Sequence, residues 1–290
     1  MCYNIGMKSN CGLKTKYGGT RRRFNRPVLL FAILGCLLLL LVTLGLETTK
    51  YVDIPGTKVS RYGSISVDWS NASEGYIAVK HAASERKTKL RITYGSNQDT
   101  YDLATDDTWV VFPLQYGSGT YAINVYGNVS GTRYAQEYGT EISVKMTDKL
   151  SCYLYPNLKV WYTQDSEVVK KADELCAGLT TDLEKTQAVY KWICKNVKYD
   201  YVKALTVETG YLPDPDATLE SLTGICYDYS SLLCAMLRSQ GVYTQLVTGT
   251  LNGTTYHAWN RVYIDGTWKT LDATFAGKYG SSAYKLECTF

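Results

Sequence analysis

Apolar and polar residues alternate along residues 47–150, and this alternation predicts a series of short β-strands. Glycine, asparagine, serine and aspartate interrupt the alternation at regular intervals, as turns do between neighbouring strands. Six segments show the pattern most clearly: "SISVDW", "GYIAVKHA", "KLRITYG", "TWVVFPL", "GTYAINVYG" and "EISVKM". About six or seven short strands in a segment of this length predict a small β-sandwich-like module.

This β module admits two interpretations. It is a spacer, or its many tyrosines contact cell-wall glycan or protein. His81 lies within one of its predicted strands, where we expect a structural or surface role rather than metal binding.

Helical spacing replaces the alternation after residue 150. Residues 166–178 and 181–197 place apolar side chains three and four positions apart, which predicts two helices. Thr181 and Glu184 occupy the two positions of a capping box at the start of the second helix. Residues 211–220, "YLPDPDATLE", are rich in Pro and Asp and predict a loop.

A third helix is predicted from Cys226 to Gln240, with Gly241 at its C-terminal end. Three alternating segments then predict an antiparallel sheet: "YTQLVTGTL", "TTYHAWNRVYI" and "TWKTLDATF". Asn-Gly at 252–253 and Asp-Gly at 265–266 separate them, and both dipeptides favour two-residue type I′ hairpin turns. We therefore expect an α+β domain over residues 151–290.

Residues 28–46, "VLLFAILGCLLLLLVTLGL", are a run of 19 residues in which Thr43 is the only clearly polar side chain. About 20 apolar residues cross a bilayer as a helix, so we expect a transmembrane anchor within residues 27–46. The basic sequence "RRRFNR" precedes it. The positive-inside rule then places the tail, residues 1–26, in the cytoplasm and the rest of the chain outside a single-pass plasma-membrane anchor.

This apolar run admits two other interpretations. A cleaved signal peptide usually has an apolar region of about 7–15 residues and a small-residue cleavage site, for which Thr43 and Gly45 are a poor match. The segment "ILGC", ending at Cys36, resembles a lipoprotein cleavage box, but the apolar run continues for ten residues past the cysteine. A retained anchor fits the sequence best.

The net charge of +4 comes from the tail rather than from the predicted domains. Seven of the 31 Lys and Arg residues lie in residues 1–26, which contain no acidic residue, so the remainder carries 24 basic and 27 acidic side chains. A nucleic-acid-binding protein would carry its basic excess on the folded part. We therefore expect no nucleic-acid partner.

Six of the nine cysteines follow the predicted anchor: Cys152, Cys176, Cys194, Cys226, Cys234 and Cys288. The chain has no C-x-x-C pair and only two histidines, which argues against a structural zinc site. No metal or other cofactor is expected. Export would permit disulfides, but the sequence does not assign partners.

The Asp-Gly turn fixes a register between the last two predicted strands. A two-residue turn pairs Ile264 with Thr267 and, further along, Trp259 with Asp272. Side chains alternate between faces, so His257 and Asp272 project from the same face as diagonal neighbours, roughly 7 Å apart at the backbone. An aspartate at this distance can hold one ring nitrogen of the histidine.

The two cysteines of the third helix differ in their surroundings. Cys226 lies in the first helical turn after Gly224, where free backbone N–H groups and the helix dipole favour a thiolate and can stabilise an oxyanion. Cys234 lies in the helix body among leucines and is expected to be a packing residue. Cys194, beside an apolar stripe, is expected at the margin of the core.

Three segments in this order resemble the transglutaminase-like superfamily, whose catalytic core is similar to that of papain-type cysteine proteases: "GICYDYSSLLCAMLRSQGV", "YHAWNRVYIDGTW" and "LDATF". The resemblance covers roughly residues 150–290 and includes "WICKNVKYD" and "GYLPD", which are similar to segments of bacterial members. It implies a papain-like α+β fold in which Cys226 is the nucleophile, His257 the base and Asp272 the orienting acid.

In this family an aromatic side chain upstream of the cysteine often stabilises the oxyanion. Tyr199 and Trp192 are the candidates here, although each also fits a core position. Trp259, on the same face as His257, is a candidate wall of the site.

The implied chemistry is acyl transfer through a thioester on an amide of protein or cell-wall peptide at the cell surface. An amine acceptor would give a cross-link, and water would give deamidation or proteolysis. The alternative is a surface module that keeps the fold and works by binding.

Overall fold

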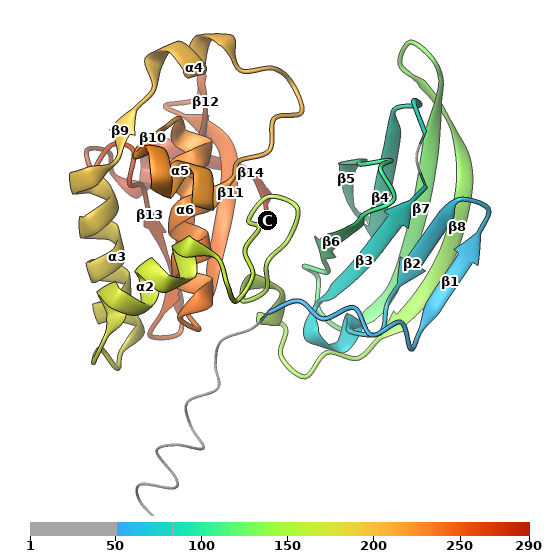
Figure 1. Cartoon of the computed structure of the whole chain (residues 1–290), viewed down its shortest axis with the longest axis horizontal. Helices are drawn as coiled ribbons and strands as arrows, with labels where there is room; N and C mark the ends of the chain where they lie inside the picture. Colours follow the sequence, from blue (N-terminus) through green and yellow to red (C-terminus); the bar gives the residue numbers. More distant parts are fainter. Residues whose placement is uncertain (1–50, 83) are drawn as a thin grey trace, which may run out of the picture. The chain divides into compact units, whose positions relative to one another are not determined.

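The computed structural model describes residues 51–82 and 84–290 (Figure 1). The predicted tail, residues 1–26, and the predicted anchor, residues 28–46, lie outside the described residues. In the part of the chain that is described, no helix combines the length and apolarity that a membrane span needs.

The first part of the described chain contains two four-stranded sheets with antiparallel neighbours. One has the order β1 (Val59–Tyr62), β2 (Ile65–Asp68), β3 (Tyr76–His81) and β6 (Trp109–Pro113). The other has the order β5 (Asn97–Leu103), β4 (Thr88–Tyr94), β7 (Gly119–Ser130) and β8 (Arg133–Val144). Inward side chains of both sheets, such as Val67, Phe112, Ile92 and Ile123, form one core.

β1 and β5 were not among the six segments predicted from the alternation. β5 reads "NQDTYDL", and only Tyr101 and Leu103 of this strand are buried, since it pairs with β4 at the edge of its sheet. An edge strand with mostly polar side chains shows little hydrophobic alternation, so the sequence pattern does not reveal it. β5 forms through its backbone pairing with the neighbouring strand β4.

The second part contains α2 (Glu167–Cys176), α3 (Asp182–Asn196), α4 (Tyr201–Thr206), α5 (Pro215–Ser221) and α6 (Cys226–Ser239). The three predicted helices agree with α2, α3 and α6 to within two residues. The capping box is present, because Thr181 accepts from the Glu184 N–H and the Glu184 carboxylate accepts from the Thr181 N–H.

The predicted loop over residues 211–220 is wrong in its second half, where α5 begins. Pro215 takes the first helical position, where its missing N–H costs no hydrogen bond. The Asp214 carboxylate caps this end by accepting from the N–H groups of Asp216 and Ala217. The same Pro and Asp residues that disfavour a helix interior therefore start a helix here.

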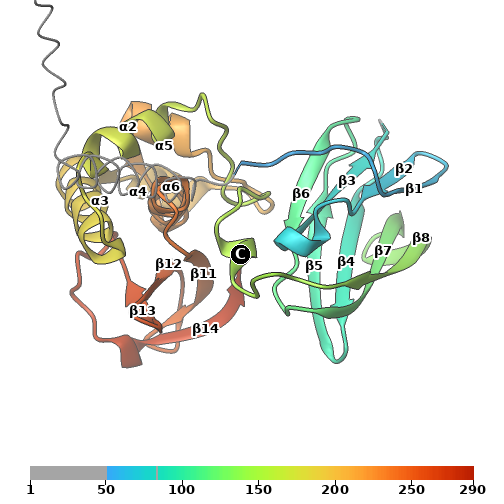
Figure 2. The same ribbon diagram turned by 90° about the horizontal axis from the view of Figure 1, so that it is seen from below.

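The C-terminal sheet has the order β13 (Thr267–Leu271), β12 (Thr255–Ile264), β11 (Thr244–Leu251) and β14 (Tyr284–Thr289), all antiparallel. Two short strands, β9 (Lys198–Tyr199) and β10 (Thr223–Gly224), pair in parallel before α6. β14 adds a fourth strand to the three predicted, and none of its residues is buried. Figure 2 shows the helices on one side of this sheet.

The two hairpin turns differ. Asp265 and Gly266 have positive φ, and Ile264 pairs with Thr267, which confirms the predicted two-residue turn. Leu251 pairs instead with Thr255, so the β11–β12 loop has three residues and the two-residue prediction is wrong there. The Thr254 N–H donates to the Leu251 carbonyl at 3.3 Å and closes the turn one residue before the strand pairing begins.

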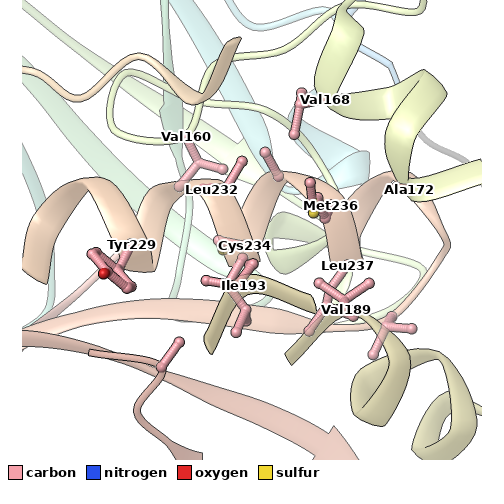
Figure 3. Packing of buried hydrophobic residues seen from close by; sticks show 14 of the residues in the cluster. Val160, Val168, Ala172, Val189, Ile193, Tyr229, Leu232, Cys234, Met236 and Leu237 are labelled. Atoms are coloured by element: carbon pink, nitrogen blue, oxygen red, sulfur yellow. The ribbon is translucent and has the colours of Figure 1, made fainter. Parts of the chain in front are cut away.

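α6 is the central helix of the second part and packs against β11, β12, α2, α3 and α5. Every residue from Asp228 to Ser239 is buried. Figure 3 shows Cys234 among these core side chains, where its thiol lies 3.3 Å from the Thr244 carbonyl. The predicted packing role of Cys234 is confirmed. Cys194, half-buried and packed against the same core, is confirmed at the margin.

Candidate active site

Cys226 is the first residue of α6. It is half-buried and contributes to the lining of a cavity of about 440 Å³. The N-cap residue, Ile225, has no polar side chain that could cap the helix. Its backbone N–H donates to Asp228 Oδ2 at 2.8 Å. The thiol thus lies at the positive end of a fourteen-residue helix.

His257 and Asp272 lie side by side as the register predicted. β12 and β13 pair from Ile264–Thr267 to Asn260–Leu271, and Asp272 follows directly after β13. The His257 Nε2 lies 2.9 Å from Asp272 Oδ2, and both side chains are almost fully buried, at 3% and 4% exposure. Because Nε2 is bonded to the carboxylate, Nδ1 is the ring nitrogen left for Cys226.

Three further donors hold the Asp272 carboxylate. The Tyr284 hydroxyl donates to Oδ2 at 2.8 Å, and the N–H groups of Thr274 and Phe275 donate to Oδ1 at 2.9 Å and 3.4 Å. These hydrogen bonds fix the orientation of the carboxylate that holds His257. Tyr284 was not predicted, because it lies on β14 beyond an irregular loop and no short-range pattern relates it to Asp272.

The pKa of His257 reflects burial and two partners. Burial lowers it, but hydrogen bonds to Asp272 and Cys226 and the charges of both groups outweigh burial and raise the pKa from 6.5 to about 9. The imidazole is therefore protonated at neutral pH and lies close to the thiol. An imidazolium beside a thiol favours the thiolate.

Aromatic rings surround His257 on its buried side. Trp259 stacks on it at a centroid distance of 6.1 Å, and Phe275 lies at 5.1 Å. Trp259 is only 2% exposed and does not line the cavity, so it supports the imidazole from behind rather than contacting the open space.

Tyr199 lies at the cavity and close to Cys226. Its strand, β9, pairs with β10, which places Tyr199 opposite Gly224 just before α6. Burial and the charge of Cys226 raise the pKa of Tyr199, while a hydrogen bond from the Cys226 backbone N–H lowers it. The Tyr199 hydroxyl therefore lies beside the start of α6 and accepts from the Cys226 N–H.

Trp192 is not brought to this cavity. It lies on α3, partly buried against the core, with the Lys171 ammonium 5.2 Å from its ring centroid. Of the two upstream aromatic candidates, the structure places Tyr199 beside Cys226 and Trp192 elsewhere.

The cavity has one wall from the start of α6 and another from α4 and the loop that follows it. β11 and β12 contribute residues opposite them. The side chains and backbone of the second part that line it are Lys159, Tyr199, Ala204, Val207, Glu208, Thr209, Gly210, Tyr211, Ile225, Cys226, Tyr227, Thr248, Tyr256, Ala258 and Phe290.

Residues 169–273, which include Cys226, His257 and Asp272, match the model of the transglutaminase-like superfamily. These residues belong to that superfamily. Its members are usually cysteine proteases or acyltransferases, and some are non-catalytic. The transglutaminase-like domain therefore accounts for the α+β fold of the second part, in agreement with the resemblance of its three motifs.

Curated relatives are similar to part of this chain and are much longer than it. The chain is 32% identical over 127 residues to human (Homo sapiens) kyphoscoliosis peptidase, covering 38% of this chain and 19% of that protein. It is 32% identical over 124 residues to the mouse (Mus musculus) kyphoscoliosis peptidase, covering 39% and 19%. The chain thus spans about one fifth of the length of these relatives.

A solved structure of a candidate cysteine protease from Cytophaga hutchinsonii is also similar. It aligns at a TM-score of 0.38 with 18% identity and covers 67% of this chain and 68% of that one.

Proposed function

We propose that this chain is a cysteine-dependent acyltransferase or hydrolase that acts on carboxamide or peptide bonds. The observation that supports this most directly is the placement of the Cys226 thiol at a helix start beside His257, which is itself hydrogen-bonded to Asp272 at 2.9 Å. A nucleophile, a base and an orienting acid in this order are the arrangement that acyl transfer through cysteine requires.

In the first step the Cys226 thiolate attacks the carbonyl carbon of the amide and forms the S–C bond. The C–N bond then breaks, and the His257 imidazolium gives its proton to the departing nitrogen. Asp272 holds the ring orientation throughout and stabilises the protonated form. The product of this step is a thioester on Cys226 and a free amine or ammonia.

Two donors are near the position of the developing oxyanion. The Cys226 N–H at the start of α6 donates to the Tyr199 oxygen when no substrate is bound, and both this N–H and the Tyr199 O–H would donate to the oxyanion when it forms. Donors at such a point stabilise a tetrahedral intermediate more strongly than the planar substrate. We assign Tyr199 this role within the proposal.

In the second step an amine or water attacks the thioester carbonyl and transfers its proton to His257. The C–S bond breaks and restores the Cys226 thiolate beside the His257 imidazolium. A primary amine gives an isopeptide cross-link, whereas water gives deamidation or peptide cleavage. We propose a protein or cell-wall peptide as acyl donor, presented at the outer face of the plasma membrane to a chain anchored through residues 28–46.

Thiol labelling tests the proposal independently of substrate. The full chain is treated with iodoacetamide between about pH 5 and 9, and labelling of Cys226 is followed by mass spectrometry. We expect fast labelling near neutrality. His257→Ala should slow it at pH 7 by about tenfold or more, because an ordinary thiol with a pKa of about 8.5 is only a few per cent ionised there.

The matched control removes the other histidine, His81, which lies on β3 of the β module. Its substitution by alanine should leave the Cys226 rate unchanged. Slow labelling of wild-type Cys226 with an ordinary thiol profile would favour the alternative, a surface binding module that keeps this fold. Incorporation of a fluorescent amine into dimethylcasein, measured beside casein cleavage, then separates cross-linking from hydrolysis.

A further inference from the structure

α4 is turned the opposite way from an ordinary surface helix. Three of its apolar side chains face solvent, with Tyr201 75%, Val202 72% and Leu205 88% exposed. Its one charged side chain, Lys203, points inward and bonds to the buried carboxylate of Asp228 at 2.7 Å. The position of α4 is therefore not set by burial of an apolar face, which is the usual cause.

Asp228 receives hydrogen bonds from both ends of this segment. Its Oδ2 accepts from Lys203 Nζ, and its Oδ1 accepts from the Tyr211 hydroxyl at 2.6 Å. Lys203 Nζ also donates to the Tyr211 hydroxyl at 2.7 Å, which closes a three-membered network. Asp228 has no exposed surface while the Lys203 side chain is 32% exposed, so the carboxylate is desolvated and its charge-assisted bonds are stronger than those of a surface pair.

The same carboxylate lies at the start of the helix that carries Cys226. Oδ2 accepts the Ile225 N–H at 2.8 Å, one residue before the thiol. Gly224 leaves room for it, because a Cβ there would lie 2.6 Å from the Asp228 Cβ and 2.9 Å from Oδ2. One side chain thus joins the α6 start to the segment 201–211.

That segment is one wall of the Cys226 cavity. Ala204 and Val207 line the cavity from α4 and the residue after it, and Tyr211 lines it from the end of the loop. Between Lys203 and Tyr211 the wall is exposed at almost every position, so it has little core packing of its own. Its two bonds to Asp228 are the polar contacts that tie it to the nucleophile helix.

We propose that Asp228 is a positioning residue for substrate: through Lys203 and Tyr211 it fixes the wall 201–211 against the start of α6 and so sets the shape of the acyl-donor site. This inference rests on the proposed function of Cys226. Ala204 and Val207 give this wall of the cavity an apolar lining, and Tyr256 adds an aromatic ring from β12. The acyl donor that fits such a lining is a peptide with apolar residues next to the reactive amide.

The test compares small and large reagents at the same thiol, using the full chain. Iodoacetamide needs only the thiol, whereas an apolar peptidyl chloromethyl ketone also needs the wall. We expect Lys203→Met to lower the labelling rate with the peptidyl reagent about tenfold, and Tyr211→Phe to lower it about threefold. In both variants the labelling rate with iodoacetamide should change by less than about twofold. Backbone hydrogen exchange over residues 201–211 should rise at least tenfold in Lys203→Met.

Removal of Lys203 alone leaves a buried carboxylate without its cation and could prevent folding. The double variant Lys203→Met/Asp228→Asn removes both the cation and the carboxylate charge. It should show the same fall in the ratio of the peptidyl labelling rate to the iodoacetamide labelling rate. Lys203→Arg should restore at least part of the peptidyl rate. Lys170→Met is the matched control, since Lys170 pairs with Glu167 at 2.6 Å on an exposed helix face away from the cavity lining.

Two failures are distinguishable. Slow reaction of wild-type Cys226 with iodoacetamide would count against the proposed function, while hydrogen exchange would still report on the wall. Two results would overturn the positioning role of Asp228. One is hydrogen exchange over residues 201–211 at the wild-type rate in the folded double variant, and the other is an unchanged ratio of the peptidyl and iodoacetamide labelling rates.

Discussion

At the scale of single residues, both carboxylate oxygens of Asp272 accept hydrogen bonds, and together these bonds orient His257. Oδ2 accepts from His257 and Tyr284, while Oδ1 accepts from the Thr274 N–H. A carboxylate held on both oxygens cannot rotate, so the imidazole it bonds keeps one orientation. Tyr284 therefore acts on the histidine through the aspartate.

Loss of the tyrosine hydroxyl should weaken this orientation without disturbing the fold. We expect Tyr284→Phe to lower kcat/KM by about threefold to tenfold, as the loss of one buried hydrogen bond worth about 1 kcal/mol implies. The rate at which iodoacetamide labels Cys226 should also fall. Tyr263→Phe, on the distal half of β12, is the control and should retain wild-type rates.

The raised pKa of His257 also predicts how stability depends on pH. The group has a pKa of about 9 in the folded protein and about 6.5 when unfolded, so the folded state binds the proton more tightly. Its contribution to the free energy of unfolding is complete below about pH 6.5 and is lost as the pH rises through about 9.

Urea unfolding of the 48–290 fragment at several pH values checks this sign. We expect the wild-type fragment to lose roughly 1–3 kcal/mol between about pH 6.5 and 9.5 from this group. In Asp272→Asn the partner charge is absent, and the loss over this interval should become much smaller. Equal pH slopes in the two proteins would contradict the assignment of the shift to the His257–Asp272 pair.

At the scale of elements, the start of α6 depends on a close approach between Gly224 and Asp228. Gly224 belongs to β10 and pairs with Tyr199, while Asp228 lies one turn into the helix. The absence of a Cβ at residue 224 lets the carboxylate reach back to the Ile225 N–H. The glycine before the cysteine is therefore required by packing rather than by an unusual backbone angle.

Gly224→Ala should displace the Asp228 side chain and with it the first turn of α6. We expect a loss of about 1–3 kcal/mol in the free energy of unfolding, as overpacking of a buried site typically costs, together with slower labelling of Cys226. Gly280→Ala is the control, because a Cβ there meets no atom within 4 Å. Its free energy of unfolding should change by less than about 0.5 kcal/mol.

At the scale of the whole molecule, no helix of the described residues could span a membrane, and we propose that residues 28–46 anchor the chain. The seven basic residues before this segment predict that the tail stays in the cytoplasm. The proposed enzyme would then work at the outer surface on substrates that it meets there.

Fractionation of cells checks this assignment. The full chain should remain in the membrane pellet after carbonate extraction, and external protease should digest residues after 47 in intact cells. Deletion of residues 28–46 should release the protein from the pellet. Recovery of the full chain in the soluble fraction, or protection of its C-terminal part, would contradict the proposed orientation.

The motifs and their periodicity were sufficient to predict α2, α3 and α6, three of the four C-terminal strands and the proximity of His257 to Asp272. These features follow from local rules: apolar spacing, a capping box and an Asp-Gly turn that permits one register. The superfamily follows from the same short segments. Assignment of catalytic roles to Cys226, His257 and Asp272 remains a prediction for the labelling experiment.

Tertiary structure alone decided which distant groups join this core. Tyr284 reaches Asp272 across an irregular loop, and Lys203 reaches Asp228 from a helix whose apolar side faces solvent. Arg238, fully buried on α6, donates to the carbonyls of Thr244, Tyr155 and Phe290. Periodicity describes which face of an element avoids water, but such polar contacts depend on which chain segments meet once the apolar faces have packed.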